Sequence, residues 1–249
     1  MDVVDLRSFY AGPLGRMVCS VVSSTLAPIV NARADQRILG LGYATPYFRK
    51  LLPPDNHACA FMLARQGVIH WPRTGLVRSA LVDECDLPLL ESAIDQVLVV
   101  HGLEMADAPA DMLQEIWRVM APQARLYLVV PNRRGLWSAS DASPFGFGQP
   151  FSRTQVQSLL TTAQFQIVQW RHALFMPPAT GRTMLKAGPV FERIGAFAAT
   201  RFSGVIIIEA VKQVYAFTSG KRARRLVHRL RPALLPSPQS ARQDASPRN

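Results

Sequence analysis

The fold is decided by the stretch Ile94–Asn132, which reads IDQVLVVHGLEMADAPADMLQEIWRVMAPQARLYLVVPN. It opens with a β-branched apolar run, Ile94–Val100, and closes with a second apolar run, Arg125–Val130, which Pro131 ends. Both runs are typical of strands that are buried on both faces of a sheet. The segment between them is long enough for a helix. The stretch therefore predicts a strand, a crossing helix and a second strand parallel to the first.

The helix is expected over Asp107–Met120. Acidic residues lie in its first turns and Arg118 lies in its last turn, which matches the helix dipole, and Pro122 ends it. Apolar side chains recur on one face at helical spacing. They are Met112, Leu113, Ile116, Trp117 and Met120. We expect this face to cover the sheet.

The alternation of strands and helices continues on both sides of this stretch. Upstream we expect strands at Arg37–Leu41, Ala58–Leu63 and Leu76–Val82, and a short helix near Pro46–Leu52. Downstream, Ser152 and Gln155 form a capping box for a helix that runs to about Ala163. Two further strands are expected at Phe165–Phe175 and Gly204–Val214. This order predicts an α/β fold, a doubly wound and mostly parallel sheet with helices on both faces.

Three regions of the chain differ in composition. Residues 1–35 read as an N-terminal helical segment, which Pro13 and Pro28 divide. The α/β domain is expected over 36–218, with a helical insertion at 176–203. Residues 219–249 form a basic tail that is low in hydrophobicity toward its end, and we expect it to be partly disordered.

The overall composition is that of a globular protein, with 49% hydrophobic and 18% charged residues among 249. No apolar run reaches the roughly 18 residues that a membrane-spanning helix needs. Asp2 and Asp5 give the start of the chain the wrong charge for a signal peptide. The three cysteines, at positions 19, 59 and 85, have no CxxC spacing, so neither a disulfide framework nor a metal site is expected. These features predict a cytoplasmic protein.

The positive charge is concentrated at the end of the chain. The formal net charge is +11, and the segment from Ser219 onward carries eight basic residues and one acid, which is +7 of that total. The rest of the chain is only mildly basic, so a nucleic-acid groove there is not indicated. Within the tail, Lys221–Arg231 interleaves basic and apolar residues. It is either a solvated tail or a surface that contacts anionic lipid, RNA or an acidic partner.

Three turns that follow predicted strands hold the candidate functional residues, because open α/β sheets bind ligands at the carboxyl ends of their strands. The first turn holds Gly40 and Gly42, the second Asp83 and Glu84, and the third His101. Glycines let a ligand approach the backbone, a carboxylate accepts hydrogen bonds from an amine, and a histidine serves as ligand or base. Each has a plainer interpretation as a structural turn, a solvated acid or a buried histidine.

Taken together, these turns resemble class I S-adenosylmethionine-dependent methyltransferases, and in particular the small-molecule group called type 11. The resemblance is carried by the spacing of Leu87-Pro88, Ile94-Asp95, Leu103-Glu104, the segment Leu113–Pro122 and the ending Pro131-Asn132. It covers residues 36–132 well and continues more weakly to Val214. It implies a Rossmann-like methyltransferase fold of seven strands with an antiparallel last strand, and S-adenosylmethionine as cofactor.

The resemblance also implies which residues contact that cofactor. The family's glycine-rich motif falls on Ile38–Pro46, whose backbone would hold the methionine part. The adenine-contacting acid falls on Asp83, and His101 falls below the methionine part. Tyr10 lies where relatives carry an N-terminal aromatic segment. The implied cofactor-binding residues are Gly40, Leu41, Gly42, Tyr43, Ala44, Met62, Asp83, Glu84 and His101.

Departures from the family pattern are concentrated at the cofactor motif. Gly40 stands where the family has an acid, and Pro46 stands at a glycine position. Met62 falls where an acid normally accepts the ribose hydroxyls, and no acid occurs between Asp55 and Asp83. Loss of one charge-assisted hydrogen bond lowers affinity about 10- to 150-fold. Binding of the cofactor is therefore expected to be weakened or lost.

Two functions remain open. The first is an S-adenosylmethionine-dependent methyltransferase acting on a small molecule, for which His101, Tyr43 and Tyr10 are the candidate catalytic residues. The second is a catalytically inactive relative that binds or regulates a protein partner. Methylation of nucleic acid is not indicated, because an Asn/Asp-Pro-Pro-aromatic motif is absent.

The loop after the second central strand adds two features with open interpretations. Arg133 and Arg134 either face an acidic substrate or are exposed loop charges. Aromatic residues of this loop, among them Trp137 and Phe145, either line a pocket or pin the loop to the body.

Overall fold

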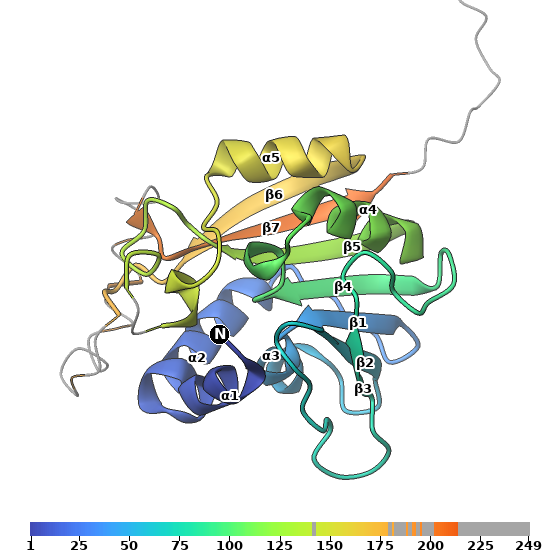
Figure 1. The fold of residues 1–249 in the computed structure, drawn as a ribbon, viewed down its shortest axis with the longest axis horizontal. Helices are drawn as coiled ribbons and strands as arrows, with labels where there is room; N and C mark the ends of the chain where they lie inside the picture. The colour runs from blue at the N-terminus through green and yellow to red at the C-terminus, as the bar shows by residue number, and fades with distance from the viewer. Residues whose placement is uncertain are drawn as a thin grey trace, which may run out of the picture. The chain divides into compact units, whose positions relative to one another are not determined.

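The computed structural model describes residues 1–140, 143–178, 181, 188, 191–192, 195 and 202–213. These residues form a seven-stranded sheet in the order β3-β2-β1-β4-β5-β7-β6 (Figure 1). The strands are β1 Arg37–Gly42, β2 His57–Leu63, β3 Ser79–Val82, β4 Ile94–Val100, β5 Met120–Pro131, β6 Phe165–Ala173 and β7 Val205–Lys212. Strands β1 to β5 are parallel, whereas β7 is antiparallel to both β5 and β6. The predicted doubly wound sheet with an antiparallel last strand is confirmed.

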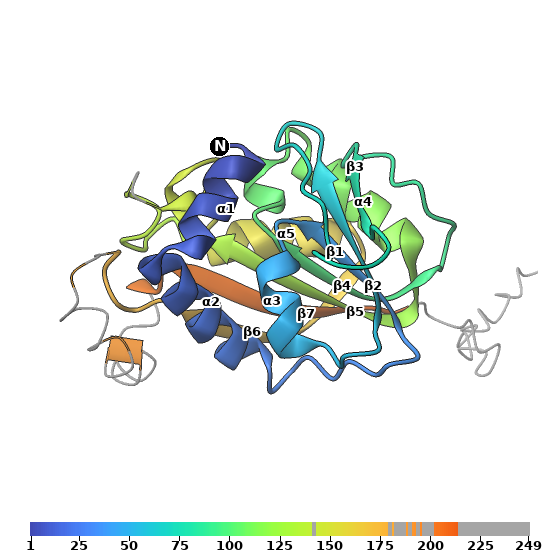
Figure 2. The same ribbon diagram turned by 90° about the horizontal axis from the view of Figure 1, so that it is seen from below.

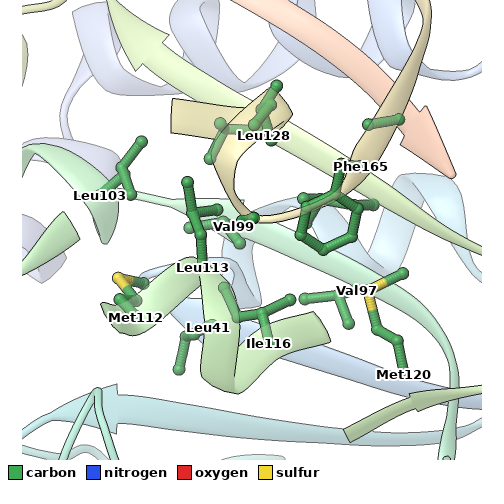
Figure 3. Packing of buried hydrophobic residues seen from close by; sticks show 14 of the residues in the cluster. Leu41, Val97, Val99, Leu103, Met112, Leu113, Ile116, Met120, Leu128 and Phe165 are labelled. Carbon is green, nitrogen blue, oxygen red and sulfur yellow. The ribbon is translucent and has the colours of Figure 1, made fainter. Parts of the chain in front are cut away.

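Helices cover both faces of the sheet. The helices are α1 Val3–Ala11, α2 Pro13–Leu26, α3 Thr45–Leu51, α4 Pro109–Val119 and α5 Arg153–Thr162, with 3-10 turns at Leu103–Met105 and Pro144–Gly146. In Figure 2, α1, α2 and α3 lie on one side of the sheet, and their buried side chains form one apolar cluster with it. On the other side, α4 and α5 form the second cluster, in which Leu113 and Ile116 pack on Val97 and Leu128 (Figure 3).

The stretch that decided the fold behaves as its pattern predicts, with shifted boundaries. β4 occupies Ile94–Val100. Helix α4 begins at Pro109, because proline is tolerated in the first turn of a helix, where the missing N–H has no intrahelical acceptor. The chain turns extended at Met120, so β5 begins directly after the helix rather than at Arg125.

Among the other strands, β3 and β6 are shorter than the sequence predicts. β3 begins at Ser79 and not at Leu76, whose side chain is exposed outside the sheet. β6 ends at Ala173 because Leu174 adopts a left-handed backbone conformation with φ of 64°, which cannot continue a strand. Most of the predicted insertion at 176–203 and all of the tail at 219–249 lie outside the described residues.

Side-chain caps fix the starts of two helices. Ser152 accepts a hydrogen bond from the Gln155 backbone N–H, and the Gln155 side chain accepts one from the Ser152 backbone, as the capping box predicts. Asp2 and Asp5 form the same reciprocal arrangement at α1. These two acids therefore cap the first helix. Within the described part of the chain, no helix is long and apolar enough to cross a bilayer.

Candidate functional site

The turn after β1 brings the ends of β1 and β4 into contact. Gly42 has a φ of 78°, and the Tyr43 N–H donates a 2.7 Å hydrogen bond to the Val100 carbonyl. A side chain at position 42 would collide with the backbone of Val100 and His101. Glycine is required here by both the backbone conformation and the close approach of β4. The first and third predicted turns are thus adjacent in space.

The position of the family's acid, Gly40, has no room for a larger side chain. A Cβ atom there would overlap the ring of Phe48 and approach the methyl group of Ala44. Pro46 lies in the first turn of α3, where it supplies no backbone donor. The packing of α3 against β1 therefore fills the space in which a carboxylate would reach a cofactor.

A hydrogen-bonded network of buried side chains lies where β1 and β4 end. The Tyr10 hydroxyl from α1 is 2.6 Å from the Tyr47 hydroxyl and 2.8 Å from His101 Nε2. On the other side of the imidazole ring, Nδ1 is 3.2 Å from Glu104 Oε1. His101 is 2% exposed and Tyr47 is fully buried. Three segments that are distant in sequence thus meet in one continuous polar chain within the core.

Further aromatic rings pack against this network. The ring of Phe145 lies 4.7 Å from that of His101, and the rings of Tyr10 and Tyr43 are 5.6 Å apart. Trp137 packs edge-on against Phe145 and donates a 2.6 Å hydrogen bond from its indole to the Met176 carbonyl. Trp137 and Phe145 therefore pin their loop to the body, which decides between the two interpretations of these residues. We call Tyr10, Tyr43, Tyr47, His101, Glu104, Trp137 and Phe145 the closed cluster.

Burial determines the protonation of the phenols in the closed cluster. It raises the pKa of Tyr10 and Tyr47 well above the ordinary value, and in Tyr10 the nearby Tyr47 raises the pKa further. Burial also raises the pKa of Tyr43, partly offset by Arg7 and Arg73. All three phenols are therefore neutral at pH 7 and act as hydroxyl groups, not as phenolate bases.

His101 and Glu104 show two signs of a constrained position. His101 has a φ of 51°, which is uncommon outside glycine and costs roughly 1–3 kcal/mol. Glu104 Oε2 is buried and has no hydrogen-bond partner among the described residues. An acid and an imidazole in this arrangement can hold a proton between them. His101 and Glu104 are three residues apart in the sequence, and this spacing is the pattern that could have identified Glu104 as a candidate site residue. No comparable pattern points to Tyr47 or Phe145.

The end of β2 lacks a carboxylate in the structure as in the sequence. Met62 is fully buried inside the strand, and its sulfur accepts a 3.4 Å hydrogen bond from the Ile69 N–H. Three residues beyond the strand, the side-chain amide of Gln66 donates a hydrogen bond to the His101 carbonyl. Gln66 is 2% exposed, so it supports the turn that carries His101 and is not presented to solvent.

The acids that follow β3 lie apart from the closed cluster. One oxygen of Asp83 accepts a 2.8 Å hydrogen bond from the Cys85 N–H, which makes a local turn. Glu84 is buried and accepts a 3.3 Å hydrogen bond from the Asp107 N–H. Among the described residues, neither acid forms a hydrogen bond with Tyr10 or His101. The structure thus brings together Gly42, Tyr43, Tyr10 and His101 but not the two acids.

The strand order and the turn after β1 define the class I methyltransferase fold, as solved structures bear out. A methyltransferase from Thermotoga maritima matches with a TM-score of 0.58 at 13% identity over 85% of this chain and 96% of that one. A methyltransferase from Archaeoglobus fulgidus matches with a TM-score of 0.54 at 13% identity, covering 78% and 94%. The 4+2 cyclase SpnF matches with a TM-score of 0.51 at 20% identity, covering 78% and 80%.

The sequence comparison finds one similar domain in the central part of the chain. Residues 39–128 match the model of the type 11 methyltransferase domain, described as a methyltransferase domain. No curated protein sequence matches the chain. This part of the chain is similar to the family's domain, and the resemblance drawn from its turns is confirmed. S-adenosylmethionine is the cofactor that goes with this domain and fold.

The side chains that the structure places at the ends of β1 and β4 do not fit this cofactor in their present arrangement. Phe48 fills the space beside Gly40, the ring of Tyr10 packs against Tyr43 of the glycine turn, and Phe145 packs against His101. The end of β2 offers no carboxylate for the ribose diol.

Proposed function

We propose that this protein is a methyltransferase-fold binding protein that acts without methyl transfer, because its own side chains occupy the cofactor's place. The observation that carries the proposal is the hydrogen-bonded contact of Tyr10 with both Tyr47 and His101. It joins the N-terminal helix to the turn that methyltransferases use for the cofactor. The fold itself does not require methyl transfer, since the similar SpnF is described as a cyclase.

Opening the closed cluster would cost free energy that a cofactor must supply. Withdrawing Tyr10 breaks two buried hydrogen bonds, each worth about 1 kcal/mol, and exposes a ring whose burial contributes roughly 2 kcal/mol. A conformational cost of about 4 kcal/mol weakens apparent affinity roughly a thousandfold. The missing ribose acceptor weakens it further. These losses together support a protein that does not bind the cofactor at cellular concentration.

The test is a calorimetric titration of the full chain with S-adenosylmethionine and with S-adenosylhomocysteine. We expect neither heat nor a thermal shift up to millimolar ligand. Micromolar binding of either compound would overturn the proposal. Tyr10→Ala serves as the matched variant, because it removes the side chain that fills the site. Weak binding gained only in this variant would attribute the closure to Tyr10.

A second candidate is an S-adenosylmethionine-dependent methyltransferase with a small-molecule acceptor. It is favoured by the domain match and by the contacts of His101, which has Glu104 at Nδ1 and Tyr10 at Nε2. With Nδ1–H directed at Glu104, Nε2 would be the atom that accepts a proton. In that case α1 moves aside to admit ligands. The same titration decides between the candidates, because micromolar cofactor binding is required for the second alone.

The remaining features extend the proposal. The domain boundary near residue 218 and a cytoplasmic location stay predictions from the sequence. A protein partner or an anionic membrane surface for the basic segment Lys221–Arg231 is proposed on charge alone. Deletion of residues 219–249 followed by vesicle co-sedimentation tests the membrane part, and unchanged sedimentation would contradict it.

A further inference from the structure

A cavity of about 280 Å³ opens at the carboxyl edge of the sheet, beside the ends of β5 and β6. Its lining residues are Asn132, Arg134, Ser152, Arg153, Thr154, His172 and Ile206. Asn132 and Ile206 are buried, whereas Arg134 and Arg153 are exposed. The cavity thus has a partly apolar floor and a basic rim.

The two arginines lack acidic partners in the described part of the chain. Among the ion pairs that the described residues form, none involves Arg134 or Arg153. The guanidinium of Arg153 instead lies 4.7 Å from the centre of the Trp170 ring. The backbone N–H of Arg134 donates a 3.2 Å hydrogen bond to Asn132 Oδ1, which fixes the turn that carries it. Both arginines therefore line the cavity without an acidic partner among the described residues.

Backbone donors of α5 face the same charges. The capping box satisfies the N–H of Gln155, but Ser152 supplies no acceptor for the N–H groups of Arg153 and Thr154. Free donors and the helix dipole favour an anion at this end of a ten-residue helix. The guanidinium groups of Arg134 and Arg153 add further N–H donors. Together these donors are more than the two oxygens of a carboxylate accept, and they suit the three oxygens of a phosphate group.

We propose that this cavity binds the phosphate group of a small molecule, with Arg134 and Arg153 as the principal contacts and the first turn of α5 as a third. The inference rests on the proposed binding function and names the chemical class of its ligand. The cavity has a volume near the lower end of small-molecule sites. It therefore accommodates a phosphate and a short organic part, with His172 and Ile206 beside the latter.

The experiment is a calorimetric titration of the full chain with inorganic phosphate, with monomethyl phosphate and with acetate at constant ionic strength. It is repeated on Arg153→Gln, Arg134→Gln and the matched control Arg133→Gln. Arg133 is the exposed neighbour that does not line the cavity, and its side chain donates a 3.2 Å hydrogen bond to the Pro150 carbonyl. All variants keep the basic tail, so its nonspecific attraction for anions cancels. Circular dichroism checks that each variant is folded.

We expect saturable phosphate binding that weakens about tenfold in Arg153→Gln and in Arg134→Gln and is unchanged in Arg133→Gln. Equal weakening in all three variants would overturn the site in favour of a generally basic surface. Absence of saturable binding would also overturn it. Acetate binding as tight as phosphate would overturn the assignment to phosphate. Because no cofactor is added, these outcomes are distinguishable from failure of the proposed function, which only the S-adenosylmethionine titration reports.

Discussion

Two regions of the same sheet edge differ in what they offer a ligand. At the ends of β1 and β4, the closed cluster fills the crevice with phenols, an imidazole and an indole. At the ends of β5 and β6, the edge is hollow and rimmed by Arg134 and Arg153. The first region is the switch point of the sheet, where ligands bind in open α/β folds. A fold can therefore keep the sheet edge that binds ligands while its open cavity lies at a different pair of strands.

The two regions differ because their residues are held differently. The closed cluster joins α1, α3 and the turn after β4 through side chains that are almost fully buried. The open cavity is bounded by a helix start and two strand ends, whose long side chains extend into solvent. Removing a side chain should therefore destabilise the fold in the first region and only alter binding in the second. The predictions below test this contrast.

Tyr47→Ala should produce the largest change. It leaves a cavity in the core and removes a hydrogen-bond partner of Tyr10, at a cost of about 3–5 kcal/mol in the free energy of unfolding. Thr154→Ala, at the open cavity, is the matched control and should change stability by about 0.5 kcal/mol or less. Urea denaturation followed by circular dichroism measures both. Similar losses in the two variants would abolish the distinction between the regions.

High pH should open the closed cluster while the basic rim is unaffected. The pKa values of Tyr10 and Tyr47 are raised in the folded state, so their stabilisation is complete below pH 10 and is lost as the pH rises above it. Each phenol then destabilises the fold by roughly 1 kcal/mol for each pH unit above 10. Absorbance at 295 nm and circular dichroism should change in one transition. Ionisation of these phenols without unfolding would contradict their burial.

Tyr10→Phe removes only the hydroxyl that links the cluster. The Tyr47 hydroxyl and His101 Nε2 lose their shared partner, which should cost about 1–3 kcal/mol. The phenyl ring still fills the space, so we expect no heat of cofactor binding in the calorimetric titration, in contrast to Tyr10→Ala. Denaturant unfolding and calorimetry together measure these effects. Cofactor binding in Tyr10→Phe would show that the hydrogen bonds, and not the ring, close the site.

The smallest effect concerns His172 at the open cavity. Its pKa is lowered, first by burial and second by the positive charge of Arg153. Arg153→Gln should raise this pKa by a fraction of a unit, and bound phosphate should raise it in the wild type. A proton NMR titration of the imidazole resonance measures both shifts. No response to Arg153→Gln would separate His172 from the basic rim.

The sequence predicts the sheet and the turns at its carboxyl edge. It does not predict the side-chain contacts of the closed cluster or the cavity beside β5 and β6. β4 and the Ser152 capping box follow from local pattern, because period and capping chemistry are local properties. The resemblance to methyltransferases predicts that Tyr10 lies near the cofactor turn. Its contact with Tyr47 spans 37 residues and that with His101 spans 91, and no local pattern encodes such pairs.

For the same reason, the sequence indicates only some of the residues that line the open cavity. The adjacent Arg133 and Arg134 look equivalent in sequence, but only Arg134 lines the cavity, since Arg133 reaches back to Pro150. The other lining residues come from α5, β6 and β7, which tertiary packing alone brings together. Side-chain direction, not residue type, separates the two arginines.

The position of β7 has a consequence for synthesis of the chain. β7 comes last of the described strands, yet it lies between β5 and β6 (Figure 1). While the ribosome is still producing residues 205–212, β5 exposes an unpaired apolar edge and β6 has no neighbour in the sheet. Such edges readily pair with other chains. The nascent protein is therefore most prone to aggregate just before its sheet can close, and a chaperone that shields β5 would act in that interval.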